Sequence, residues 1–282
     1  MNYNFKSMLH ESDLKTHSVS GGLSHIEFEN ASIGYPGAIV LENINLKIPP
    51  GSQVAVVGPN GAGKSTLFKA LVGLIPLLSG DIRVHGLSVA SHHDCIAYIP
   101  QREEVDWKFP VTVRDVVAMG RFGKQGLFRR ESKADKEIIN EALHRLNIEE
   151  LAAKPIGNLS GGQQQRAFLA RAIAQQPHIL ILDEPFNGVD VNTHQVILNL
   201  LISMKLHDVT ILVSTHDLNL AAEKFEKVIL LNKKMIYFGD PEQAFTQDNL
   251  QIAFGKQILL LNNKQSILVD ECCPTEDKVN QV

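Results

Sequence analysis

The spacing of apolar residues along the chain predicts an α/β protein that begins with strands. From His25, apolar and polar residues alternate through Ile33, and they alternate again over 44–48, as in strands with one buried face. A strand over 53–57 then leads into a glycine-rich segment, and helical spacing of apolar residues follows over 64–72. We therefore expect a strand-rich start followed by a strand, a loop and a helix.

Further along the chain the hydrophobic period changes twice. Helical spacing over 112–174 predicts an all-helical insertion. The continuous apolar run over 179–182 is typical of a parallel strand covered on both faces. Shorter elements are expected as a turn at Ser79-Gly80, strands over 81–84, 96–99 and 210–214, an irregular connection over 102–110, a helix over 191–206, and hairpins over 228–238 and 259–269.

The glycine-rich segment fits the pattern G-x-x-x-x-G-K-[ST], which marks a phosphate-binding loop between a strand and a helix. Glycines let backbone N–H groups turn toward an anionic phosphate, and the helix N-terminus adds its positive dipole end. Lys64 supplies a full charge at the outer phosphates, and Ser65 is the predicted magnesium ligand. The residues of this predicted nucleotide site are Gly58, Pro59, Asn60, Gly61, Ala62, Gly63, Lys64, Ser65 and Thr66.

Two adjacent acids follow the apolar run over 179–182, where a parallel strand ends and α/β sheets bind ligands. Asp183 suits the shell of a magnesium ion held beside a nucleotide triphosphate. Glu184 can accept a proton from the attacking water or orient it. The predicted fold is thus an α/β, phosphate-loop (RecA-like) core with a strand-rich N-terminal part and an inserted all-helical subdomain.

Composition indicates a globular protein and argues against nucleic acid as a partner. Lys plus Arg is 27 against 31 for Asp plus Glu, a formal charge of −4, and no long basic run occurs. No uncharged stretch reaches the ~18 apolar residues of a membrane span, and the start of the chain does not resemble a signal peptide. Three cysteines are too few for a disulfide framework. We expect a cytoplasmic location.

The segment Leu159-Ser160-Gly161-Gly162-Gln163-Gln164-Gln165-Arg166 resembles the signature of ATP-binding cassette (ABC) ATPases, and it precedes Asp183-Glu184-Pro185 at the family's spacing. The resemblance covers about 25–240. It implies that Tyr35 stacks on adenine, that Gln101 reaches the metal or the attacking water, and that His216 contacts the γ-phosphate. The implied domains are a flexible tail over 1–22, an ATPase domain over 23–250 with its helical subdomain at 111–176, and a C-terminal extension with a disordered tail over 251–282.

The signature residues also have a physical interpretation. Ser160 is placed like an N-cap, with Gly161, Gly162 and Gln163 opening a helix, which makes a second phosphate site. In the family, two cassettes form a head-to-tail homodimer, and the signature of each cassette completes the nucleotide pocket of the other. Asp190 lies where the family has its D-loop, although the preceding residues differ from the usual pattern.

Residues 104–113, 119–121 and 186–190 are similar to cassettes of importers for divalent transition metals. This resemblance implies a Mg-dependent ATPase subunit at the cytoplasmic face of the membrane, docked on integral-membrane permease subunits through 102–110 and the helical insertion. An extracytoplasmic metal-binding protein would be an indirect partner. Manganese is the favoured cargo, with zinc or iron next. Trp107 and Phe109 are open to two interpretations, apolar packing or contact with a partner.

Two alternatives remain: a soluble cassette ATPase acting on nucleic acid or ribosomes, and an importer cassette for another cargo such as a metal chelate. The single cassette, the lack of sustained heptads and the acidic balance argue against the first. A small-molecule kinase would have no use for the signature. His92-His93 and Cys272-Cys273 lack further ligands at good spacing, so no transition-metal site is expected in this chain.

Overall fold

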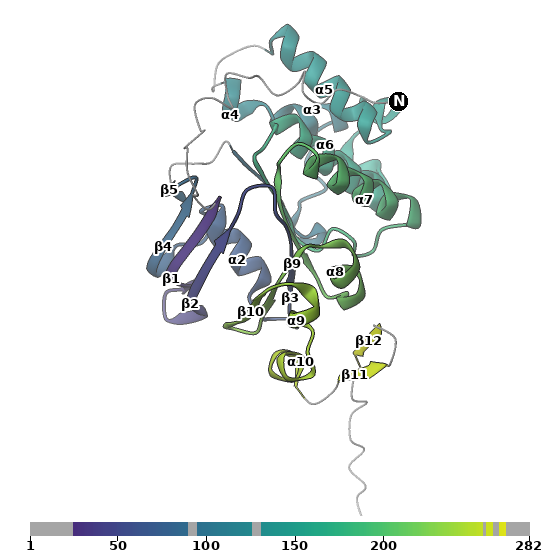
Figure 1. The fold of residues 1–282 in the computed structure, drawn as a ribbon. Helices are drawn as coiled ribbons and strands as arrows, with labels where there is room; N and C mark the ends of the chain where they lie inside the picture. Colours follow the sequence, from purple (N-terminus) through teal and green to yellow (C-terminus); the bar gives the residue numbers. More distant parts are fainter. Residues whose placement is uncertain (1–24, 90–94, 126–130, 256–257, 262–264, 269–282) are drawn as a thin grey trace, which may run out of the picture.

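An antiparallel sheet forms one side of the protein in the computed structural model, which describes residues 25–89, 95–125, 131–255, 258–261 and 265–268 (Figure 1). Its strand order is β2-β1-β4-β5. The bounds are β1 Ile26–Tyr35, β2 Ala38–Ile48, β4 Leu77–Val84 and β5 Leu87–Ser88. Alternate residues of β1 are buried, as the sequence predicted, because they face a core while their neighbours face solvent.

The turn predicted at Ser79-Gly80 was wrong. Both residues lie inside β4, where the pairing with β1 shifts register. Gly80 has a φ of +77°, and a Cβ built there would lie 2.2 Å from the carbonyl oxygen of Asn30. A bulge with glycine in the left-handed region therefore bends the strand without ending it.

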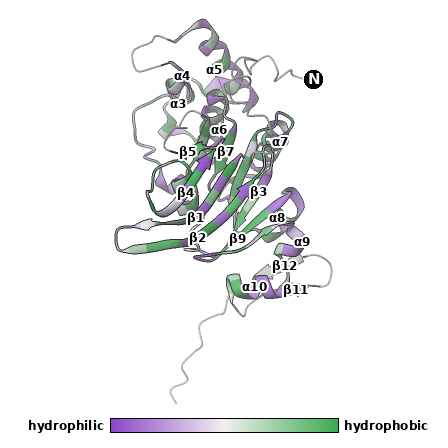
Figure 2. Ribbon diagram, turned by 60° about the vertical axis from the view of Figure 1, so that its left-hand side comes forward, coloured by the Kyte–Doolittle hydropathy of each residue, from purple (hydrophilic) through white to green (hydrophobic). Residues whose placement is uncertain are grey.

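The second sheet carries the parallel strands, in the order β10-β9-β3-β8-β7-β6. The hydrophobic residues of this sheet are concentrated on its buried strands (Figure 2). Every residue of β3, β7 and β8 is buried, as expected for strands covered on both faces. The bounds are β3 Gln53–Val57, β6 Ile96–Ile99, β7 Ile179–Leu182, β8 Thr210–Thr215, β9 Lys227–Leu231 and the antiparallel edge strand β10 Met235–Gly239.

The helical subdomain comprises α3 Val113–Met119, α4 Phe122–Gln125, α5 Lys133–Arg145 and α6 Gly161–Gln175, with short 3₁₀ turns at Arg102–Glu104, Glu149–Leu151 and Ile156–Asn158. Capping boxes start α3, α5 and α6. Arg121 joins three of its segments from a buried position. Its guanidinium donates to Asp135 Oδ1 at 2.9 Å, to the Ala174 carbonyl at 2.8 Å and to Gln176 Oε1 at 3.0 Å.

The remaining helices cover the two sheets. α2 Lys64–Leu71 packs between them, and α7 Val191–Lys205 and α8 Leu218–Lys224 lie on the opposite face of the parallel sheet (Figure 1). α9 Pro241–Ala244, α10 Gln247–Phe254 and the hairpin of β11 Ile258–Leu261 and β12 Gln265–Leu268 follow. The predicted fold class is confirmed. None of the described helices combines the length and the apolar character that a membrane crossing requires.

Candidate functional site

The predicted phosphate loop connects β3 to α2, at the carboxyl end of a central parallel strand. Gly63 caps α2 with a φ of +102°, a conformation that L side chains rarely adopt. A Cβ at this position would also lie 2.6 Å from the side chain of Leu41. The backbone can therefore turn here only with glycine, as the loop pattern requires.

Lys64 is nearly buried, with 5% of its surface exposed, and its ammonium group lies against the loop. Its Nζ donates to the carbonyl oxygens of Gly58 at 2.9 Å and Pro59 at 3.3 Å. It also lies 3.5 Å from Glu184 Oε1. The structure therefore brings the loop lysine and the second acid together.

Asp183 is buried at the end of β7 and has a defined set of donors. Ser214 Oγ donates to Asp183 Oδ1 at 2.5 Å, and the Tyr98 hydroxyl lies 3.5 Å from the other oxygen. Burial raises the pKa of Asp183 above its usual value, although hydrogen bonds from Ser214 and Ser65 act in the opposite direction. Burial disfavours the ionised form of a carboxyl group, and a nearby cation stabilises that form.

The groups around Asp183 fit a magnesium ion. Ser65 hydrogen-bonds to Asp183, and Gln101 Nε2 donates to Ser65 Oγ at 3.4 Å, so a carboxylate, a hydroxyl and an amide converge. Mg²⁺ prefers oxygen ligands and is held through one or two carboxylates plus substrate phosphates. The structure thus brings Ser65, Gln101 and Asp183 together, and their role as magnesium ligands stays a prediction.

Glu184 has an uncommon backbone conformation, with a φ of +49°. Its N–H donates to Ser214 Oγ at 2.8 Å, and its carboxylate accepts from the Asn187 amide as well as facing Lys64. Ser214 Oγ therefore hydrogen-bonds to both Asp183 and Glu184. Neither Ser214 nor Asn187 was assigned a role from sequence. Their only signal was their place in the segments that carried His216 and the D-loop resemblance.

His216 and Tyr35 occupy exposed positions outside this hydrogen-bond network. His216 follows the carboxyl end of β8, which pairs in parallel with β3 and β7, so it lies at the same sheet edge as the loop. Tyr35 ends β1 in the antiparallel sheet and is 50% exposed. An aromatic ring with an exposed face can stack on a base, but the structure does not bring Tyr35 into contact with the two acids.

The signature residues lie at the start of α6, and its first two glycines lie against the side chains of Arg102 and Asp190. Ser160 is the N-cap of the helix, as predicted, and the structure adds a capping box with Gln163. A Cβ at Gly161 would meet the Arg102 guanidinium at 2.8 Å, while one at Gly162 would lie 2.3 Å from Asp190 Oδ2. Backbone therefore approaches side chains closely at both glycines.

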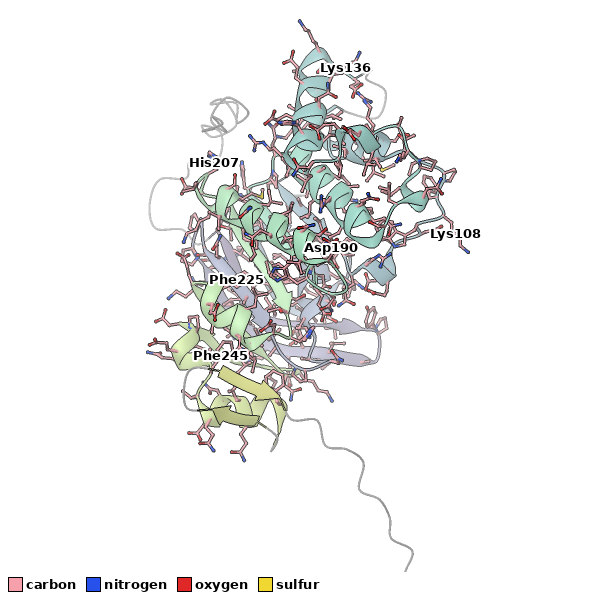
Figure 3. All side chains as sticks on the ribbon, turned by 90° about the vertical axis from the view of Figure 1, so that its right-hand side faces the viewer. Lys108, Lys136, Asp190, His207, Phe225 and Phe245 are labelled. Atoms are coloured by element: carbon pink, nitrogen blue, oxygen red, sulfur yellow. The ribbon has the colours of Figure 1, made fainter. Side chains whose placement is uncertain are left out.

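Asp190 caps α7 beside the signature helix (Figure 3). It accepts from the backbone N–H and the hydroxyl of Thr193, both at 2.9 Å, and these bonds hold the pKa of Asp190 below its usual value. Arg166 of α6 donates to the same hydroxyl at 3.2 Å. The signature helix and the predicted D-loop are thus linked within one chain.

Comparison with known proteins places the chain in a family. The family model described as ABC transporter matches residues 41–187. The chain is 44% identical over 239 residues to the manganese transport system ATP-binding protein MntB of Bacillus subtilis, covering 85% of this chain and 96% of that protein. It is 44% identical over 233 residues to the zinc transport system ATP-binding protein TroB of Treponema pallidum, covering 83% and 88%.

The fold agrees with this result. A solved metal-chelate type ABC transporter in an inward-facing conformation superposes with a TM-score of 0.74 and 28% identity, covering 88% of this chain and 98% of that one. A nucleotide-binding ATPase is the enzyme class that the motifs predicted, and it is confirmed. The chain belongs to the ABC transporter family.

Proposed function

We propose that this protein is the ATP-hydrolysing subunit of a membrane importer for a divalent transition metal, with manganese the favoured cargo. The observation that carries the proposal is the similarity to a manganese transport ATPase over 85% of the chain, together with the convergence of Lys64, Asp183 and Glu184. Similarity to a zinc transport ATPase makes zinc the next candidate, followed by iron.

In this proposal the loop over 58–66 binds the triphosphate of ATP through its backbone N–H groups and Lys64. Ser65, Gln101 and Asp183 would hold Mg²⁺, which when bound neutralises negative charge on the phosphates. The Asp183 carboxylate fits because it is buried and already oriented by Ser214. Tyr35 contributes its exposed ring to the adenine base.

Glu184 is the proposed catalytic residue for water. Its carboxylate lies beside Lys64, at the end of the strand that also carries Asp183, so it faces the region where the outer phosphate binds. There it orients the attacking water or accepts its proton at a carboxylate oxygen. His216, exposed at the end of β8, donates a hydrogen bond to the γ-phosphate.

The signature residues serve the nucleotide of a second copy in this proposal. Ser160, Gly161, Gly162 and Gln163 begin a 15-residue helix whose N-terminal N–H groups favour an anion. The hydrogen bonds of Ser160 stay within its own helix, and Asp190 bonds Thr193 next to it. A head-to-tail homodimer would place this helix start on the partner's γ-phosphate, with Asp190 at the same interface.

The permease is expected to dock on the helical side of the cassette. Trp107 packs on Phe168 with ring centroids 5.0 Å apart, whereas Phe109 and Phe122 are 58% and 61% exposed. Lys108, next to Phe109, lies at the outer edge of this region (Figure 3). Exposed aromatic side chains are typical of surfaces that bind a protein partner. An extracytoplasmic metal-binding protein would then act through the permease.

Reconstitution tests the proposed function. The cassette, the permease and the metal-binding protein are placed in proteoliposomes, and ATP-dependent uptake of manganese is followed with zinc and iron as competing cargoes. We expect manganese uptake that requires ATP and loaded binding protein. Uptake of none of the three metals, with ATP hydrolysis intact, would contradict the importer assignment.

A further inference from the structure

Three histidines meet where the two sheets join. His25 precedes β1, His85 lies in the turn between β4 and β5, and His178 precedes β7. His85 Nε2 lies 3.0 Å from His25 Nε2 and 3.3 Å from His178 Nδ1. One ring nitrogen from each histidine lies within 4.8 Å of the other two. This group, the three-histidine cluster, unites segments that are far apart in the sequence.

Backbone hydrogen bonds fix the positions of all three residues. The N–H of His85 donates to the carbonyl of His25 at 3.0 Å, which joins the start of β1 to the turn after β4. The N–H of Thr210, at the start of β8, donates to the carbonyl of His178 at 2.9 Å. The rings are therefore presented by ordered strand ends, as a preorganised ligand set requires.

His25 has the chemistry of a metal ligand. It is 5% exposed, and its Nε2 lies 3.0 Å from the Nε2 of His85. Its Nδ1 lies 2.5 Å from the hydroxyl oxygen of Thr210. When that oxygen accepts the Nδ1 proton, the lone pair of Nε2 points to the other two rings. Metal-binding histidines are commonly oriented by such a bond.

The distances suit a tetrahedral ion. Zn²⁺ binds histidine nitrogen at about 2.0–2.1 Å, so two nitrogens on one tetrahedral ion lie about 3.3 Å apart. His85 Nε2 lies 3.0 and 3.3 Å from the other two nitrogens, and all three nitrogens lie within 4.8 Å of one another. Three imidazole nitrogens suit zinc and its neighbours nickel and copper, whereas manganese prefers carboxylate, carbonyl and water oxygens.

We propose that His25, His85 and His178 bind one zinc-class divalent ion, with water as the fourth ligand, and that this ion joins the antiparallel sheet to the parallel sheet. The site is separate from the nucleotide site. It lies at the amino ends of β7 and β8, and the four residues of β7 alone span ~13 Å. The proposal corrects the expectation that the chain holds no transition-metal site, and it is independent of the transported cargo.

Zinc titration of the full chain tests the site. Chelator-treated protein is titrated with zinc chloride by calorimetry, and thermal unfolding is followed with and without zinc. We expect one zinc per chain and a higher Tm with zinc, because an ion that binds only the folded state stabilises it. The informative variants are His85→Asn, chosen because Asn tolerates the φ of +52° at this position, and His178→Gln.

Each of the two variants should weaken zinc binding at least about 100-fold and lose the rise in Tm. His144→Ala, which removes an exposed histidine bonded to Glu149, is the matched control and should bind zinc like the parent. Magnesium-dependent ATPase activity without zinc verifies that each variant folds. A second control is Cys272→Ser with Cys273→Ser, which should leave this binding unchanged.

Cobalt provides an independent readout. Co²⁺ replacing zinc should give the intense visible bands of a tetrahedral site without a sulfur-to-cobalt charge-transfer band. A large excess of manganese should not displace it. The proposal is overturned if the parent binds no zinc, if binding survives both His85→Asn and His178→Gln, or if it is lost with the tail cysteines.

Discussion

Gly162 lies directly against Asp190: a Cβ built on the glycine would be 2.3 Å from the Asp190 Oδ2 atom. Asp190 cannot easily move away, because its carboxylate caps α7 through the backbone N–H and the hydroxyl of Thr193. At Gly161 the corresponding contact is with the flexible end of Arg102. A side chain would therefore meet an anchored carboxylate at Gly162 but the end of a long arginine side chain at Gly161.

Gly162→Ala should therefore destabilise the protein more than Gly161→Ala. Overpacking against anchored groups costs about 1–3 kcal/mol. The Arg102 guanidinium ends a long side chain held by bonds of 3.1 and 3.3 Å to a single acceptor, Gln164 Oε1, so it can move aside more easily than Asp190. Urea unfolding of both variants measures the difference in the free energy of unfolding. Equal losses for the two variants would mean that the contact with α7 is not rigid.

Glu184→Gln should retain nucleotide affinity and lose hydrolysis. The amide keeps the shape of the carboxylate but cannot accept a proton from water, so the rate should fall ~10²- to 10⁴-fold. Phosphate release measures the rate, and gel filtration with ATP and magnesium should show a persistent dimer. Glu137→Gln, which changes an exposed acid on α5, is the control. Hydrolysis by Glu184→Gln at the parental rate would remove Glu184 from the mechanism.

Shared sites predict a specific pattern of complementation. Ser160→Arg chains and Lys64→Ala chains should each be inactive alone, and their mixture should regain activity because a head-to-tail dimer of the two holds one intact site. A chain with both changes, mixed with the parent, puts one defect in every site of the mixed dimer. ATPase activity measured across mixing ratios decides whether the sites are shared between two chains or completed within one. No recovery in the first mixture would indicate that each chain completes its own site.

Ser214→Ala should raise the magnesium concentration needed for activity. The variant removes a donor from Asp183 and leaves the Glu184 N–H without its acceptor, at a cost of about 1–3 kcal/mol. Tyr98→Phe removes only the 3.5 Å contact and should change much less. ATPase rates measured against magnesium concentration test both. An unchanged magnesium requirement in Ser214→Ala would show that the serine does not orient Asp183 for the ion.

Asp135→Asn should destabilise the helical subdomain by about 3 kcal/mol, because Arg121 would be left as a buried charge without its partner. Asp81→Asn is the matched control. It breaks an arginine pair of similar length, 2.8 Å, with both side chains 39% exposed, and should cost less than about 1 kcal/mol. Urea unfolding near neutral pH measures both losses.

The same ion pair has a predictable pH dependence. Burial opposes ionisation of Asp135, but hydrogen bonds from Ser132 and Arg121 outweigh it and lower the pKa of Asp135. Its folded pKa is thus below the unfolded value of about 3.9, so its stabilisation is present above that pH and is lost as pH falls through the folded pKa. The difference between parent and Asp135→Asn should shrink in urea titrations below about pH 4. A difference that grows on acidification would contradict this.

Local sequence predicted the parts of the site that are built from contiguous residues. The loop over 58–66 and the acids after β7 follow from short patterns, because neighbours in the chain determine a strand, a tight turn and a helix start. The roles assigned to all the site residues, Tyr35, His216 and Asp190 included, stay predictions. For Trp107 the sequence left packing and partner contact open, and its ring packs on Phe168.

Contacts across the fold could not be predicted in the same way. Ser214 reaches Asp183 from a neighbouring strand, 31 residues away, and His85 meets residues 60 and 93 positions away. Such contacts depend on strand order and on how the two sheets pack, which no local period encodes. The His92-His93 and Cys272-Cys273 pairs, at which no metal site was expected, lie outside the described residues, as do 1–24 and 269–282. The three-histidine cluster had no signal in the linear sequence.

The buried hydrogen bonds of Arg121 make the helical subdomain rigid. The Arg121 guanidinium connects the segment that follows α3 to the first turn of α5 and to the carboxyl end of α6. Helices tied by several buried bonds resist bending far more than an exposed loop does. A rotation of α3 would therefore be passed to α6, and Ser160 would move farther than the residues near Arg121, because it lies at the opposite end of α6.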